Sequence, residues 1–225
     1  MCCGHFDTQK GRVRKGLAAL YRETVCRKLM SNQVVEICFD CSSSMKDLLN
    51  GRCGLRQESE RRVNCAKEMV EAFVVGSGSE TPFGLISFND DVRGVDIKVD
   101  NWQAIKRHLA ERELAEGTRL YEAISAAVHR IKAYIDRNGF HGKARIVVLS
   151  DGRDEGSVTG LRDLGSQLKQ VKIILDCLVI STIDPSDLET LCAETGGQFH
   201  RVTSKQDGIN FVTRRDFLDV RLRTN

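Results

Sequence analysis

The chain has 225 residues, of which 41% are hydrophobic, 29% charged and 6% aromatic. This composition is typical of a soluble globular protein, and the length suits one large α/β domain. The most apolar late segment, 171–180, contains Lys172 and Asp176 and is far shorter than the roughly 20 residues that cross a bilayer. The formal net charge is +3, but residues 1–33 are strongly basic and the remainder is slightly acidic. The body of the protein is therefore not expected to bind nucleic acid.

The first third of the chain predicts a helix, a buried strand and a second helix. Residues 11–30 are predicted to be helical because apolar side chains recur there at four-residue spacing: Val13, Leu17, Tyr21, Val25 and Leu29. The apolar run 34–39 predicts a strand, and 45–55 a loop with one turn of helix. Residues 56–75 predict a helix with four inward-facing residues, Val63, Met69, Val70 and Phe73.

The middle of the chain predicts a hairpin followed by two helices. Strands are expected at 83–88 and 92–99, and the short polar turn between them favours an antiparallel pair at the edge of a sheet. A short helix is expected at 102–109. A long helix follows at 120–137 and is closed by Asn138-Gly139.

The last third is predicted to alternate strands with helices: strand 144–149, helix 157–169, strand 172–180, helix 185–195, strand 198–202 and closing helix 206–222. Strands that alternate with helices imply a mostly parallel sheet covered on both faces. We therefore expect a three-layer, doubly wound α/β fold of the Rossmann-like kind, with six strands and one antiparallel edge strand. Residues 34–225 would form this domain, preceded by a basic extension over 1–33.

Oxygen-bearing side chains that suit a magnesium ion follow the first predicted strand. Asp40 ends that strand, and Ser42 and Ser44 stand two and four positions later. Carboxylates and hydroxyls are hard ligands, which Mg²⁺ prefers and Zn²⁺ does not. Asp151 follows the predicted strand 144–149, and Thr118 opens the long helix. Ligands in open α/β sheets gather beyond the carboxyl ends of the strands, so these five residues are expected to converge.

Each of these segments also has a simpler explanation. The serine-rich turn could cap the next helix, with Ser44 accepting backbone N–H groups. Ser150-Asp151-Gly152 alone is an ordinary turn, and Gly117-Thr118 alone is a common start of a helix. Their joint occurrence, in order and on the expected elements, favours the metal site.

Three segments in this order resemble the metal-ion-dependent adhesion site of von Willebrand factor type A domains: Asp40-x-Ser42-x-Ser44, Gly117-Thr118 and Ser150-Asp151-Gly152. The segments 83–90 and 118–124 also resemble that family, and the resemblance covers residues 34 to about 203. It implies five parallel strands and one antiparallel edge strand.

The resemblance also implies a ligand set. Ser42, Ser44 and Thr118 would bind Mg²⁺, or Mn²⁺, directly through their hydroxyls. Asp40 and Asp151 would bind it directly or through water. An Asp or Glu from a protein partner would supply the sixth ligand, and surrounding side chains would tune the choice of partner: Arg119, Arg153, Asp154 and Glu155. Glu116 stands where many members have a second glycine, and it would narrow the site or repel acidic partners.

Two other functions stay open. One is a scaffold or adaptor that binds its partners without metal. The other is a phosphotransferase like the haloacid dehalogenases, in which Asp40 would attack phosphorus, but that chemistry requires a second acid at the position of Ser42. No nucleophile with an adjacent general base is evident, because the five histidines are scattered. We therefore expect a protein without enzyme activity.

The nine cysteines fit a reducing compartment. Their number is odd, and Cys38, Cys177 and Cys192 lie inside apolar runs, which favours buried, reduced thiols. Cys38 and Cys41 have the C-x-x-C spacing, but no second pair follows at the distance of a zinc finger. We expect a cytoplasmic protein.

The N-terminal extension has two interpretations. Cys2 and Cys3 followed by Lys10, Arg12, Arg14 and Lys15 resemble membrane anchors in which paired acylated cysteines precede a basic stretch. Membrane contact would then be peripheral, at the inner leaflet. The favoured alternative is an amphipathic helix over 11–30 that packs on the domain.

Overall fold

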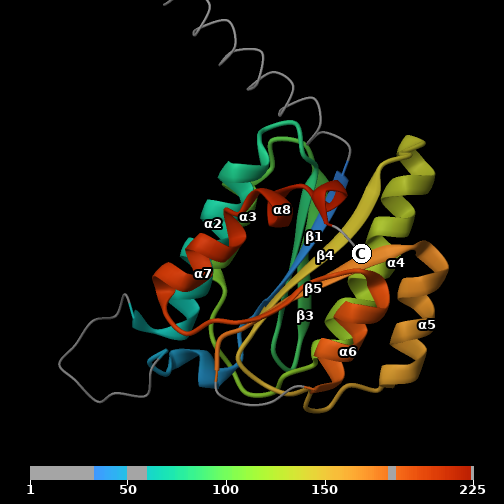
Figure 1. Ribbon diagram of the computed structural model, residues 1–225. Helices are drawn as coiled ribbons and strands as arrows, with labels where there is room; N and C mark the ends of the chain where they lie inside the picture. The colour runs from blue at the N-terminus through green and yellow to red at the C-terminus, as the bar shows by residue number, and fades with distance from the viewer. Residues whose placement is uncertain (1–32, 50–59, 182–185, 224–225) are drawn as a thin grey trace, which may run out of the picture.

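The computed structural model describes residues 33–49, 60–181 and 186–223 (Figure 1). The predicted helix 11–30 and the two cysteines at positions 2 and 3 lie outside the described residues. None of the described helices combines the length and the apolar character needed to cross a bilayer.

Six strands form one sheet, and their bounds lie close to those expected from the apolar runs: β1 Gln33–Asp40, β2 Phe83–Phe88, β3 Val92–Lys98, β4 Lys143–Ser150, β5 Ile173–Val179 and β6 Phe199–Arg201. The spatial order is β3-β2-β1-β4-β5-β6, and only the edge strand β3 runs antiparallel to its neighbour. This confirms the predicted fold class. The winding direction changes between β1 and β4, which lie side by side in the middle of the sheet.

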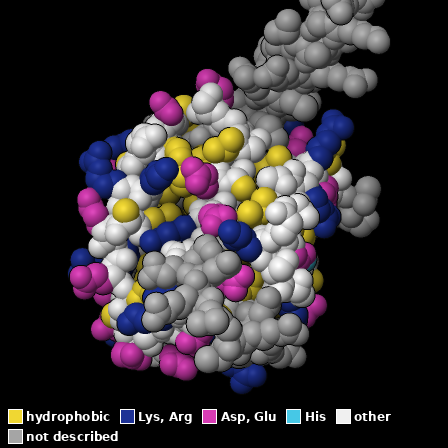
Figure 2. Space-filling model, turned by 90° about the vertical axis from the view of Figure 1, so that its left-hand side faces the viewer, with side chains coloured by type: hydrophobic (Ala, Val, Ile, Leu, Met, Phe, Trp, Pro, Cys, Tyr) yellow, Lys and Arg dark blue, Asp and Glu magenta, His cyan; other side chains and the backbone are white. Residues whose placement is uncertain are grey.

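Helices cover both faces of the sheet (Figure 1). One face carries α2 Arg62–Ser77, α3 Trp102–Glu111, α7 Lys205–Val212 and α8 Arg215–Leu218. The other face carries α4 Leu120–Asn138, α5 Leu161–Val171 and α6 Ser186–Thr195. Figure 2 looks onto the side of the molecule where α2 and α7 lie, and it shows acidic and basic side chains intermixed over much of that surface.

Strand β1 explains why the sheet has two apolar cores. Its side chains alternate, so that Val35 and Ile37 belong to one core and Val34 and Cys38 to the other. All eight residues of β1 are buried, as expected for a central strand of a parallel sheet. Its one charged residue before Asp40 is Glu36, whose carboxylate lies 3.1 Å from Arg130 of α4.

The described cysteines are buried and form no disulfide bond with one another: Cys38, Cys41, Cys65, Cys177 and Cys192. The burial of Cys38, Cys177 and Cys192 agrees with their positions in apolar runs. Burial raises the pKa of the Cys41 thiol to about 12, which suppresses the thiolate form that redox and metal chemistry require.

The single closing helix predicted over 206–222 is wrong, because the structure has α7, α8 and a 3-10 helix, η3 Val220–Leu222, in its place. The chain is extended at Arg214 between α7 and α8. This break lets Phe217 bury its ring completely, and its carbonyl accepts a hydrogen bond from the buried guanidinium of Arg145 at 2.6 Å. Tertiary packing therefore decides where the helix ends. The helix predicted over 157–169 also begins later, at Leu161.

Candidate functional site

Asp40 is held rigidly at the carboxyl end of β1. Its side chain is completely buried, and one carboxylate oxygen accepts the backbone N–H of Ser42 at 2.7 Å. The other oxygen accepts the hydroxyl of Ser150 at 2.5 Å. Because Ser150 ends β4, this hydrogen bond joins the ends of the two central strands.

A chain of hydrogen bonds connects the serine turn to Asp151. The hydroxyl oxygens of Ser42 and Ser44 lie 3.0 Å apart, and Ser44 donates to Asp151 at 2.9 Å. The alternative in which Ser44 caps a helix is not supported, because Ser44 lies inside the 3-10 helix η1 Ser43–Lys46 and its hydroxyl contacts Ser42 and Asp151. Ser42, which precedes η1, also makes no capping hydrogen bond with its side chain. The hydroxyls contact other predicted ligands instead.

Thr118 lies beside the same turn. It is buried, and its carbonyl accepts the backbone N–H of Glu155 at 2.8 Å. A Cβ atom placed on Gly152 would lie 3.9 Å from the methyl group of Thr118. Ser42 also forms a bridge with Ala115 in the loop that leads to Thr118. The three segments predicted from the sequence therefore meet at one rim of the sheet.

Gly117 allows this loop to pass close to Asp90. Its φ angle is +85°, and a Cβ atom at that position would lie 2.9 Å from the Cβ of Asp90. A residue without a side chain is needed there for both reasons. Glu116 is exposed, and its carbonyl accepts the backbone N–H of Asp90 at 3.0 Å.

Arg62 is a member of the site that the sequence did not reveal. Its guanidinium lies 2.6 Å from the buried carboxylate of Asp151 and 3.3 Å from the carbonyl of Ser44. Arg62 is the first residue of α2, where a positive charge is unfavourable because the helix N-terminus is itself positive. The ion pair with Asp151 offsets that cost. No spacing in the sequence distinguishes this arginine from the neighbouring Arg61.

Burial shapes the electrostatics of the site. It raises the pKa of the Asp40 carboxyl to about 6. Hydrogen bonds from Ser150 and Ser42 lower this pKa, and the nearby charge of Asp151 raises it. Two carboxylates in a water-poor site are stabilised by positive charge, and Arg62 supplies one such charge.

The donor set fits a hard divalent cation. Asp40 and Asp151 supply two negative charges, the hydroxyls of Ser42 and Ser44 are linked to Asp151, and the buried Thr118 lies on the adjacent loop. Oxygen donors of this kind suit Mg²⁺ or Mn²⁺. Within residues 33–49, 60–181 and 186–223, no group of three or more His, Cys, Asp or Glu side chains could hold a metal ion, so a metal here would depend on the hydroxyls.

The four residues expected to tune partner selectivity surround the site unequally. Asp154 accepts the backbone N–H of Tyr121 at 2.9 Å and the hydroxyl of Ser157 at 2.5 Å, so its carboxylate orders the loop. Arg119 pairs with Glu122 at 3.4 Å. The two remaining residues, Arg153 and Glu155, are exposed beside Asp151 and Thr118.

Comparison with known proteins identifies the fold family. Residues 35–153, more than half of the chain, match the sequence profile of the von Willebrand factor type A domain. The chain belongs to the von Willebrand factor type A domain family. The matched segment contains all five predicted ligands, from Asp40 to Asp151.

Solved structures of low sequence identity share the fold of this type A domain. An aerotolerance-related membrane protein from Bacteroides fragilis is 18% identical with a TM-score of 0.62, over 80% of this chain and 96% of that chain. BatB from Bacteroides thetaiotaomicron is 16% identical with a TM-score of 0.62, over 80% and 95% of the two chains. The pilus adhesin SpaC from Lactobacillus rhamnosus GG is 12% identical with a TM-score of 0.61, over 82% and 30%. No curated protein sequence matches the chain significantly.

Proposed function

We propose that this type A domain is a cytoplasmic protein-interaction module that binds an acidic residue of its partner through Mg²⁺ or Mn²⁺. The metal would be held by Asp40, Ser42, Ser44, Thr118 and Asp151. When bound, it would supply an electrophilic position that a carboxylate from the partner completes. The observation that carries this proposal is the hydrogen-bonded chain that joins Ser42 and Ser44 to Asp151, beside the buried Asp40.

The residues around the ligands have separate roles in this proposal. Ser150 orients the carboxylate of Asp40 through its hydrogen bond of 2.5 Å. The loop that contains Asp154 is fixed to the start of α4, which keeps Arg153 and Glu155 at the rim where a partner would approach. The adhesin among the solved structures agrees with an interaction role for this fold.

Metal binding can be tested without knowing the partner. Calorimetric titration of the full chain with MgCl₂ or MnCl₂ should give one site, and Asp40→Ala should abolish it. Because Asp40 lies at the end of its strand, circular dichroism should show that this variant stays folded. A Ser79→Ala variant, changed at an exposed position outside the site, is the matched control.

Partner recognition needs a second experiment. Affinity capture with and without EDTA, followed by mass spectrometry, should yield partners that depend on both the metal and Asp40. A set of partners that survives EDTA and Asp40→Ala alike would rule out metal-mediated recognition.

A metal-independent scaffold is the second candidate function. One observation favours it: the guanidinium of Arg62 lies 2.6 Å from the carboxylate of Asp151 and can balance its charge. A phosphotransferase is less well supported, because its second acid is replaced by Ser42, whose hydroxyl contacts Ser44. We propose that the domain is not an enzyme.

A further inference from the structure

A basic cavity lies at the rim of the sheet opposite the candidate metal site. Its volume is about 680 Å³, which is in the range of ligand-binding cavities. The cavity lies where β4 and β5 begin, whereas Asp40 and Asp151 lie where β1 and β4 end. The eight residues of β4 separate the two rims by about 23 Å. This cavity is therefore independent of the metal site.

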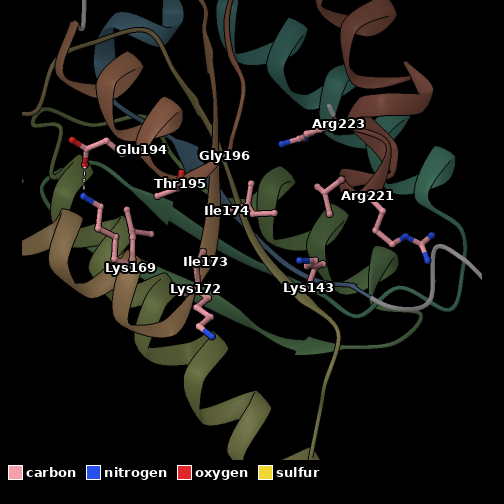
Figure 3. Close-up of a pocket in the computed structure, with 12 residues that line it drawn as sticks. Lys143, Lys169, Lys172, Ile173, Ile174, Glu194, Thr195, Gly196, Arg221 and Arg223 are labelled. Carbon is pink, nitrogen blue, oxygen red and sulfur yellow. Dashed lines mark ion pairs between the residues drawn. The ribbon is translucent and has the colours of Figure 1, made fainter. Parts of the chain in front are cut away.

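Five basic side chains and one acidic side chain line the cavity (Figure 3): Lys143, Lys169, Lys172, Arg221, Arg223 and Glu194. They come from separate parts of the chain, namely β4, α5, the start of β5, α6 and the C-terminal segment around η3. The remaining lining includes apolar residues such as Leu168 and Ile173. This mainly basic lining differs from the intermixed charges on the face with α2 and α7 (Figure 2).

Acidic side chains lie beside three of the five cations of the cavity. Lys169 lies 2.9 Å from Glu194, the pair joined by a dashed line in Figure 3. Arg221 lies 2.7 Å from Asp219. Arg223 lies 2.7 Å from Asp176, but it shares that carboxylate with the buried Arg145, so this group keeps a net positive charge. The two other lysines of the cavity, Lys143 and Lys172, have no acidic partner among the described residues and add to this excess positive charge.

Lys143 and Lys172 lie at the beginnings of two neighbouring strands. Lys143 begins β4, Lys172 directly precedes β5, and the next residues, Ala144 and Ile173, are paired in the sheet. Both lysines are exposed, and no ion pair among the described residues involves either of them. Two like charges on neighbouring segments repel each other, and an anion bound between them would offset that repulsion.

The end of α5 accounts for only part of this charge. The carboxyl end of a helix is partly negative and favours nearby lysines such as Lys169 and Lys172. However, the backbone N–H of Lys172 already satisfies carbonyls at that end, those of Leu168 and Lys169. Lys143 lies on a strand and gains no such stabilisation. The two lysines without an acidic partner alone carry as much charge as a phosphate monoester does near neutral pH.

We propose that this basic cavity binds a phosphate-bearing anion, with Lys143 and Lys172 holding the phosphate group. Lysine binds phosphate as a compact point charge, and the paired arginines nearby add positive potential. A second cavity of about 410 Å³ shares Lys143, Lys172 and Arg221, so a ligand longer than one phosphate can extend along it. The phosphate can belong to a soluble molecule or to a lipid headgroup.

The test uses the full chain and two kinds of probe. Pyrophosphate, titrated by calorimetry, represents the soluble source. Phosphatidylcholine vesicles with and without phosphatidic acid, used in a sedimentation assay, represent the lipid source. The test variant is the double substitution Lys143→Gln and Lys172→Gln. The control, Lys98→Gln and Lys106→Gln, changes the net charge equally at exposed lysines of β3 and α3.

The expected result is a loss of affinity of at least about tenfold in the test variant and less than about twofold in the control. Binding of pyrophosphate alone would assign a soluble ligand, and binding of both probes would assign the phosphate group itself. Absence of binding to both probes would overturn the proposal. An equal loss in the two double variants would also overturn it, because the effect would then reflect net charge and not the cavity.

Discussion

Replacing Arg62 should tighten metal binding at the candidate site. At 2.6 Å, Arg62 and Asp151 attract each other by about 6 kcal/mol before desolvation, at an effective dielectric constant near 20. The arginine side chain is 17% exposed, and desolvation opposes the attraction, which leaves about 1–3 kcal/mol net. A cation that binds Asp151 must displace the guanidinium of Arg62 or be repelled by it, and either effect weakens metal binding. Arg62→Gln should therefore raise the affinity for Mg²⁺ about tenfold to a hundredfold.

The assay is calorimetric titration of Mg²⁺ into Arg62→Gln, with Arg61→Gln as the matched control because Arg61 is the exposed neighbour. In EDTA, Arg62→Gln should lower the melting temperature, since it leaves the carboxylate of Asp151 buried without its partner. Mg²⁺ should restore that temperature. Equal Mg²⁺ affinity in wild type and Arg62→Gln would refute the idea that the guanidinium and the metal compete for Asp151.

Three further predictions concern stability. Burial raises the pKa of Glu36 to about 8, so the folded state holds a proton that the unfolded state releases above about pH 4.5, and stability should fall as the pH rises from 4.5 to 8. Urea unfolding at several pH values should show that the free energy of unfolding of the wild type falls by about 3 kcal/mol between pH 4.5 and pH 7. In Glu36→Gln this part of the pH dependence should be absent. Phe217→Ala removes a fully buried ring and should cost about 3–5 kcal/mol in the same assay, whereas the exposed Leu222→Ala should cost less than about 0.5 kcal/mol. Gly117→Ala should destabilise more than Gly156→Ala in thermal melts, because both have positive φ but only Gly117 has a neighbour that a Cβ would strike. A similar loss at both glycines would show that backbone strain alone decides the outcome.

The apolar runs of the sequence were enough to predict the sheet. Strands such as β1 and β4 are buried on both faces, so their near-continuous apolar sequences indicate both the element and its central place. The end of the chain was harder to predict. The break between α7 and α8 depends on the burial of Phe217 and on the hydrogen bond from Arg145, 72 positions earlier. No local pattern records such a contact.

The two carboxylates of the candidate site could be predicted from the sequence, but Arg62 could not. Asp40 and Asp151 follow strands directly, so the position of each strand in the sheet places its carboxylate at a known rim. Arg62 reaches the site because the first turn of α2 packs beside Asp151, and no pattern in the sequence predicts this tertiary contact. Lys143 and Lys172 likewise become neighbours only because β4 pairs with β5 in one particular register.

The polarity of the fold explains why the two proposed sites prefer ligands of opposite charge. Helices that connect parallel strands run back across the sheet, so α4 begins near Asp151, at the rim where the strands end. The positive helix N-terminus there favours carboxylates, and the negative carboxyl end of α5 favours lysines at the other rim. The partial charges of the helix ends therefore stabilise buried acids at one rim and basic residues at the other, but they are too small to neutralise them. At the first rim, Arg62 balances part of the negative charge by pairing with Asp151. At the other rim, Lys143 has no acidic partner among the described residues, so we expect an external anion to bind there.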